Sequence, residues 1–161
     1  MLVGATVFVG LLLGITSLIQ PLPAMPAMVS NTAGSLILLG VSLLAQRAAH
    51  DEGWRRRAAQ GLSLAVLVVA ALTLAEYALG LNLGIDRYVL GRAIQSGPNF
   101  PPGRSAPGTA VALLLASTAL LTLDNAVAVR ADLPELSAIA TALVALLSLA
   151  GYVYGSHSLY A

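Results

Sequence analysis

Several stretches of this chain run for about twenty residues without a charged side chain, and this feature most restricts what it can fold into. Residues 2–20 contain no charge at all. A helix of that length crosses the hydrocarbon core of a bilayer, which requires about 20 apolar residues. Charged residues make up 9% of the chain, whereas a soluble domain carries about 25%. So few charges cannot cover the surface of a soluble protein, and we predict a membrane protein covered by lipid.

The apolar segments predict an all-α integral membrane protein, with five transmembrane helices that form one domain over residues 1–161. The prolines between residues 21 and 29 cannot continue a helix, and Ser30 and Asn31 are good N-cap residues for the next one. In the long connection from residue 80 to 107, apolar and arginine spacing predicts a short interfacial helix over residues 84–94. Residues 124–135 form a polar link. The predicted spans are residues 2–20, 31–49, 59–79, 109–123 and 136–154.

The arginines are distributed unequally between the predicted loops. Four of the eight lie within residues 46–57, and Arg130 lies in the other short loop on the same predicted side. The long connection carries the other three. Because arginine-rich short loops remain in the cytoplasm, we place the Trp54 loop and the N-terminus there and the C-terminus outside. All basic residues are arginine, and alanine and leucine are abundant, which indicates a GC-rich bacterial genome and therefore a bacterial inner membrane.

Composition also argues against several classes of function. The net charge is +1 and there is no large basic patch, so nucleic acid is not an expected partner. The absence of cysteine excludes thiolate metal sites and disulfides. No catalytic Ser/His/Asp set, phosphate-binding loop or HExxH motif is present. We therefore predict no catalytic residues, no metal and no cofactor. The expected partners are membrane lipid and either further copies of the chain or a larger membrane complex.

Two segments of the chain resemble each other. Residues 72–80 read LTLAEYALG and residues 147–155 read LSLAGYVYG, with leucine, alanine, tyrosine and glycine at the same spacing. The second and fourth predicted spans both open with Thr-Ala. The chain is therefore predicted to consist of repeated helical hairpins. In such a repeat, Tyr77 and Tyr152 occupy corresponding positions at the same membrane level.

Glu76 is the main candidate for a functional side chain because it is the one acid inside an apolar span. A charge at such a position is costly, so the carboxyl group is expected to be neutral, paired or in contact with a wet cavity. Two interpretations remain open: a ligand or proton site, or a structural hydrogen bond that fixes the outer cap of the bundle. Arginine suits an anionic partner, although lipid headgroups are an alternative partner for the loop arginines. The candidate ligand or cap residues are Glu76, Tyr77, Asp86, Arg87, Arg104 and Tyr152.

The same region resembles the multi-span, membrane-embedded N-terminal sensor regions of bacterial signalling proteins, which precede PAS, histidine kinase or diguanylate cyclase modules. The resemblance covers roughly residues 60–160. Its first part is an E-Y-x-x-G, L-G-I-D and P-G-R-x-x-P-x-T-A pattern, and its second part is a G-Y-x-Y-G-x-x-x-L-Y corner. The matching residues are Glu76, Tyr77, Gly80, Leu83, Gly84, Ile85, Asp86, Pro102, Gly103, Arg104, Pro107, Thr109, Ala110, Gly151, Tyr152, Tyr154, Gly155, Leu159 and Tyr160.

The resemblance implies a non-catalytic sensory or signal-input domain. Members of that family continue into further spans and an output module, whereas no H-box, kinase ATP site or GGDEF motif occurs before Ala161. We therefore expect an isolated sensor region, a truncated relative or an accessory subunit. The alternative function is a small structural subunit of a respiratory or photosynthetic complex. A transporter is a weaker third hypothesis, because one buried acid and five spans supply few groups to line a pathway for an ion or solute.

Overall fold

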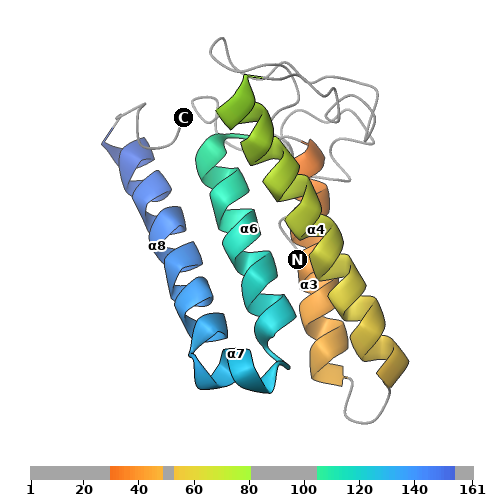
Figure 1. Ribbon diagram of the computed structural model, residues 1–161. Helices are drawn as coiled ribbons and strands as arrows, with labels where there is room; N and C mark the ends of the chain where they lie inside the picture. Colours follow the sequence, from red (N-terminus) through yellow and green to blue (C-terminus); the bar gives the residue numbers. More distant parts are fainter. Residues whose placement is uncertain (1–29, 49–52, 81–104, 155–161) are drawn as a thin grey trace.

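The computed structural model describes residues 30–48, 53–80 and 105–154 (Figure 1). These residues form α-helices and contain no strand, so the predicted all-α class is confirmed. The first predicted span, residues 2–20, and the predicted interfacial helix, residues 84–94, lie outside the described residues. The described helices are α3 (Ser30–Ala48), α4 (Gly53–Leu79), α6 (Pro107–Thr122), α7 (Ala126–Arg130) and α8 (Leu133–Val153).

The four long helices lie side by side and alternate in direction (Figure 1). Helix α6 packs against α3, α4 and α8, and α3 also packs against α4. We call one end of this bundle the Glu76 end; there α3 and α6 begin and α4 and α8 end. The opposite end, where α4 begins and where α7 lies, is called the Trp54 end. Helices α4 and α8 are thus parallel and end on the same side, which is the arrangement that the predicted repeat requires.

The helix boundaries follow local sequence signals. Helix α4 ends at Leu79, and Gly80 follows with a φ of 63°, the left-handed conformation that glycine commonly supplies after a helix. Helix α6 begins at Pro107, because proline is favoured in the first turn, where its missing N–H is not needed. Helix α4 begins at Gly53 and not at residue 59 as predicted. Its first turns contain three arginines, which are good helix formers despite their charge.

The predicted polar link between the last two spans contains a short helix, α7, that the sequence analysis did not predict. The side chain of Asn125 caps it by accepting hydrogen bonds from the backbone N–H groups of Val127 (3.0 Å) and Ala128 (3.3 Å), and such capping is a preferred role of asparagine. Asp132 then adopts a φ of 53°, a left-handed conformation that asparagine and aspartate tolerate better than most residues. Helix α8 begins directly after it.

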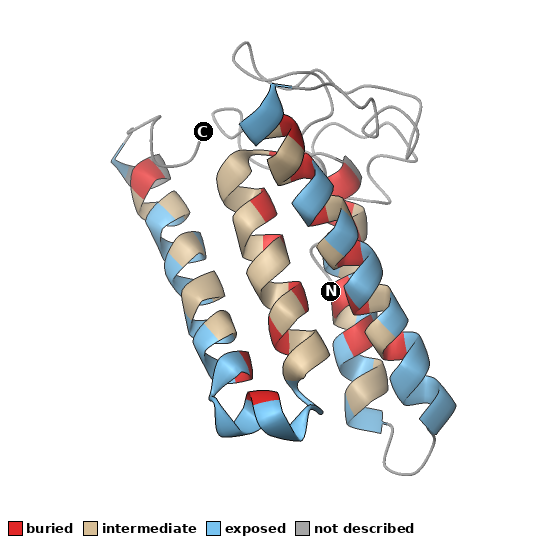
Figure 2. Ribbon diagram, viewed as in Figure 1, coloured by how far each residue is buried: buried red, intermediate tan, exposed pale blue. Residues whose placement is uncertain are grey.

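Most of the buried residues are polar or alanine, and many large apolar residues are exposed; Figure 2 shows where buried and exposed positions lie on the helices. The apolar centre is formed by Leu39, Val66, Ala70 and Leu113. A soluble monomer rarely exposes a contiguous apolar surface of more than a few hundred Å². The buried polar residues are Asn31, Ser35, Ser42, Ser63, Thr73, Glu76, Ser105 and Ser117, and the exposed leucines include Leu44, Leu64, Leu136, Leu143, Leu146 and Leu147.

Among the described helices, α4 and α8 are long and apolar enough to cross a membrane. At 1.5 Å per residue, the 27 residues of α4 extend about 40 Å, beyond the roughly 30 Å hydrocarbon core. Helix α6 is apolar but has 16 residues, which extend only about 24 Å. The prediction of five transmembrane helices is therefore seen in part, as an all-helical bundle with two helices of spanning length.

Candidate functional site

Glu76 lies in the last turns of α4 and faces the interior of the bundle. The buried residues of this helix recur every three or four positions, from Ala59 through Val66 to Glu76, and therefore lie along one face. The Glu76 side chain is only 1% exposed and is the largest fully buried side chain among the described residues. It takes part in a polar interaction. Glu76 is thus a carboxyl group on the packed face of a helix that is otherwise apolar along most of its length.

Hydroxyl groups connect three helices at the end of the bundle where Glu76 lies. The Tyr77 hydroxyl donates a hydrogen bond to the backbone carbonyl of Ser105 (2.9 Å). The Ser105 hydroxyl in turn lies 2.9 Å from the hydroxyl oxygen of Thr32, in the first turn of α3. Ser105 is buried and precedes α6 by two residues. Thr32, Tyr77 and Ser105 thus link α3 and α4 to the segment that starts α6; together with Glu76, which precedes Tyr77 in sequence, they are called the polar cap below.

The polar cap includes two predicted candidates, Glu76 and Tyr77. Tyr152 lies in the last turn of α8, and Figure 1 shows that α8 ends on the same side of the bundle. The predicted candidates Asp86, Arg87 and Arg104 lie outside the described residues.

Thr32 and Ser105 were not among the predicted candidate residues. The Thr-Ala pair that opens both predicted even-numbered spans is the sequence feature from which Thr32 could have been predicted. Ser105 adjoins the Pro-Gly-Arg motif but carries no comparable signal of its own.

We expect Tyr77→Phe to lower the free energy of unfolding by about 1 kcal/mol, because it removes one hydrogen bond to a buried carbonyl group. The measurement is unfolding in detergent followed by circular dichroism. Tyr154→Phe is the matched control, since Tyr154 directly follows α8 at the same end of the bundle but is 84% exposed. Equal losses in both variants would show that the Tyr77–Ser105 hydrogen bond does not stabilise the polar cap.

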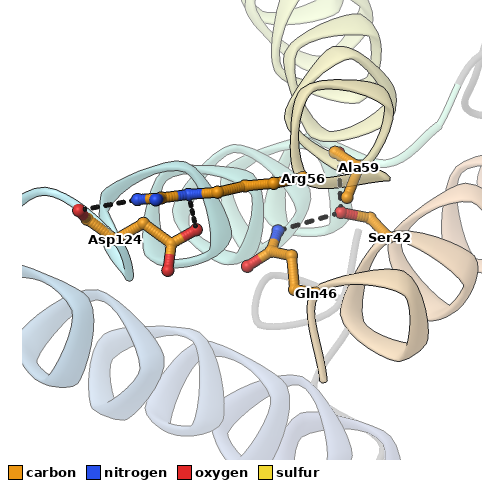
Figure 3. Close-up of polar contacts among 5 residues, drawn as sticks. All are labelled: Ser42, Gln46, Arg56, Ala59 and Asp124. Carbon is orange, nitrogen blue, oxygen red and sulfur yellow. Dashed lines mark hydrogen bonds and ion pairs between the residues drawn. The ribbon is translucent and has the colours of Figure 1, made fainter. Parts of the chain in front are cut away.

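A second polar cluster joins α3 to α4 toward the Trp54 end (Figure 3). The Ser42 hydroxyl donates to the carbonyl oxygen of Ala59 (2.8 Å). Since its one proton is used there, the Ser63 hydroxyl, 2.7 Å away, donates to Ser42. The amide nitrogen of Gln46 also donates to Ser42 (3.2 Å). The Ser42 oxygen therefore makes three hydrogen bonds, and at 0% exposure it lies where the two helices approach closely.

An ion pair at the Trp54 end connects the start of α4 to the end of α6. The Arg56 Nε atom donates to the Asp124 carboxylate (2.8 Å), and its Nη2 atom donates to the Asp124 backbone carbonyl (3.0 Å) (Figure 3). The two side chains are 49% and 35% exposed. An exposed pair of this kind contributes on the order of 1 kcal/mol or less. Its main effect is to fix the position of α4 relative to α6.

The described part of the chain has three hydrogen-bonded groups, Thr32, Tyr77 and Ser105, and one buried carboxyl group, Glu76, at the same end of the bundle, and such groups can bind a polar ligand or exchange a proton. No group of three His, Asp, Glu or Cys side chains that would hold a metal occurs among residues 30–48, 53–80 and 105–154. A comparison of the chain with protein-family models, curated proteins and solved structures gives no match.

Proposed function

We propose that this chain is a non-catalytic, membrane-embedded signal-input domain of a bacterial signalling protein, with five transmembrane helices in the inner membrane. The observation that supports the proposal best is the full burial of Glu76 at the end of the bundle where Thr32, Tyr77 and Ser105 join three helices. An ionisable side chain inside an apolar helix indicates a functional site by default. The resemblance to sensor regions, which includes Glu76 and Tyr77, agrees with this assignment.

Helix α4 provides a physical route for a signal between the two ends of the bundle. Glu76 lies near its last residue and Arg56 near its first, and Arg56 holds Asp124 at the end of α6. A ligand or charge change at Glu76 that moves α4 would therefore also act on the contact between α4 and α6 at the Trp54 end. Such coupling requires two discrete arrangements of the helices that the signal favours differently.

The arginines support a cytoplasmic location for the Trp54 end. All five arginines within the described residues lie there, in or next to the ends of α3, α4 and α7. Arginine-rich short loops remain in the cytoplasm, so the polar cap faces the outer side and the N-terminus is cytoplasmic. The described arginines are Arg47, Arg55, Arg56, Arg57 and Arg130.

This topology predicts which positions a membrane-impermeant maleimide labels. The chain has no cysteine, so single cysteines report one position each. We expect Gly53→Cys and Ala131→Cys to react in inverted vesicles and Ala78→Cys to react in right-side-out vesicles, because α4 crosses the membrane between Gly53 and Ala78. All three positions are exposed. Reaction of Gly53→Cys and Ala78→Cys from the same face would contradict a spanning α4.

The signalling role itself is tested by isolating the protein from native membranes after mild cross-linking and identifying its partners by mass spectrometry. We expect PAS, kinase or cyclase sequence, either in the same polypeptide or in a stoichiometric partner. Recovery in constant ratio with the subunits of a respiratory or photosynthetic complex would contradict the signal-input role.

That second outcome corresponds to the alternative function, a structural accessory subunit. One observation favours it: an apolar groove of about 400 Å³ runs between α3, α6 and α8, lined by residues such as Leu36, Leu43 and Ala138. Much of the remaining surface of α8 consists of exposed leucines. A membrane subunit of a large complex would bury such a groove against its neighbours.

A further inference from the structure

A second groove lies between α3 and α4 at the Trp54 end and has a volume of about 500 Å³. Both helices contribute apolar side chains to it, including Ala45 and Leu44 from α3 and Ala58 and Leu62 from α4. It extends from Trp54 to Leu62 along α4, a distance of about 12 Å at 1.5 Å per residue. The groove therefore runs from the charged end of the bundle into its apolar part.

The charged end of this groove is formed by Trp54 and Arg55. The Arg55 guanidinium carbon lies 5.5 Å from the centroid of the Trp54 ring, within the range of a cation–π contact. Trp54 is 66% exposed, and tryptophan is enriched at the boundary between lipid tails and headgroups. Arg55 also takes part in a further interaction, but a guanidinium group has five N–H donors in one plane, so it can stack on a ring, keep another partner and still donate to a phosphate. Cation and aromatic ring thus meet at the opening of an apolar groove.

We propose that this groove binds an anionic phospholipid, with its phosphate at Arg55 and the first part of one acyl chain along Leu44 and Leu62. Charge complementarity selects the headgroup, because the guanidinium group of Arg55 lies at the opening of the groove. The cytoplasmic leaflet carries the anionic lipids that attract such arginines. The proposal rests on membrane embedding as proposed above, but it does not depend on the signalling role.

Trp54 allows a direct test because it is the only tryptophan in the chain. The full chain, purified in an uncharged detergent at 0.15 M salt, is titrated with phosphatidylglycerol or phosphatidylcholine that carries brominated acyl chains, which quench tryptophan fluorescence. We expect half-quenching at a severalfold lower concentration of phosphatidylglycerol than of phosphatidylcholine. Arg55→Gln should raise the phosphatidylglycerol concentration at half-quenching about fivefold, which is the effect of losing one arginine next to an anionic headgroup. Each variant is normalised to its own unquenched fluorescence.

Arg57→Gln is the matched control, since it removes the same charge from the same helix but Arg57 does not line the groove. Because the Arg57 side chain is not part of the groove lining and salt weakens the attraction between exposed charges that are not in contact, this variant should bind phosphatidylglycerol nearly as the wild type does. Ala58→Leu fills part of the groove at an exposed position and should weaken binding of both lipids. Equal quenching by both lipids in the wild type, or equal effects of Arg55→Gln and Arg57→Gln, would overturn the headgroup site.

Unchanged binding in Ala58→Leu would overturn the groove as the acyl-chain site. These failures are distinct from a failure of the proposed function. If the cysteine variants are labelled from opposite faces of the membrane while phosphatidylglycerol has no advantage, the membrane topology stands and only the lipid site is wrong.

Discussion

Replacing Glu76 with alanine is expected to lower the free energy of unfolding by about 1–3 kcal/mol, whereas glutamine at the same position should cost little. The alanine variant removes a buried side chain that takes part in a polar interaction, and buried partners left without a hydrogen bond cost this much. Glutamine keeps the shape and most of the hydrogen-bonding capacity of glutamate. Comparing the free energies of unfolding of the two variants therefore distinguishes the contribution of the packed side chain from the contribution of the Glu76 charge.

The measurement is SDS-induced unfolding in mixed micelles, followed by circular dichroism. Glu135→Ala is the matched control, because it removes a carboxylate from the exposed first turn of α8 and should change stability by only a few tenths of a kcal/mol. If the proposed signal-input role holds and the charge of Glu76 carries the signal, Glu76→Gln should abolish the response while leaving stability near that of the wild type. If both Glu76 variants match the wild type in stability and in response, Glu76 has neither role.

The second large effect is expected at Ser42, where α3 and α4 approach closely. We expect Ser42→Leu to lower the free energy of unfolding by about 2–4 kcal/mol, because it inserts a bulky side chain into a fully packed position and removes three hydrogen bonds. Ser42→Ala removes only the hydrogen bonds. Since such bonds within membrane proteins are worth about 0.6 kcal/mol each, the alanine variant should cost about 1–2 kcal/mol.

Ser117→Ala is the control for the hydrogen bonds of Ser42. Ser117 is also 0% exposed, but its hydroxyl donates to the carbonyl of Leu113 within its own helix. That carbonyl belongs to the hydrogen-bonded interior of α6, so losing the hydroxyl should cost much less than losing Ser42. Both variants are measured by the same SDS titration. A loss at Ser117 as large as that at Ser42 would show that the contacts between α3 and α4 do not depend on the Ser42 cluster.

The local sequence was sufficient to predict the helical class and the approximate places where most described helices begin and end. Gly80 and Pro107 act on the backbone within one turn, so their effects do not depend on what packs nearby. Glu76 could also be predicted as a candidate, because an acid in an apolar helix is unusual in any fold. The start of α4 was placed six residues too late, since an arginine-rich segment has the composition of a loop even when it continues a helix.

The partners of these residues were decided by the tertiary structure. Ser105 meets Thr32 across 73 positions in sequence, and Arg56 meets Asp124 across 68. Which helices become neighbours is not encoded by an apolar stripe here, because leucine and alanine occur on every face of α3, α4, α6 and α8. Specific contacts instead come from a few small or polar side chains, such as Ser42, whose depth and partners exist only once the helices have packed. The sequence by itself therefore determined the helices and one candidate acid, and packing determined the polar cap and the lipid-sized groove.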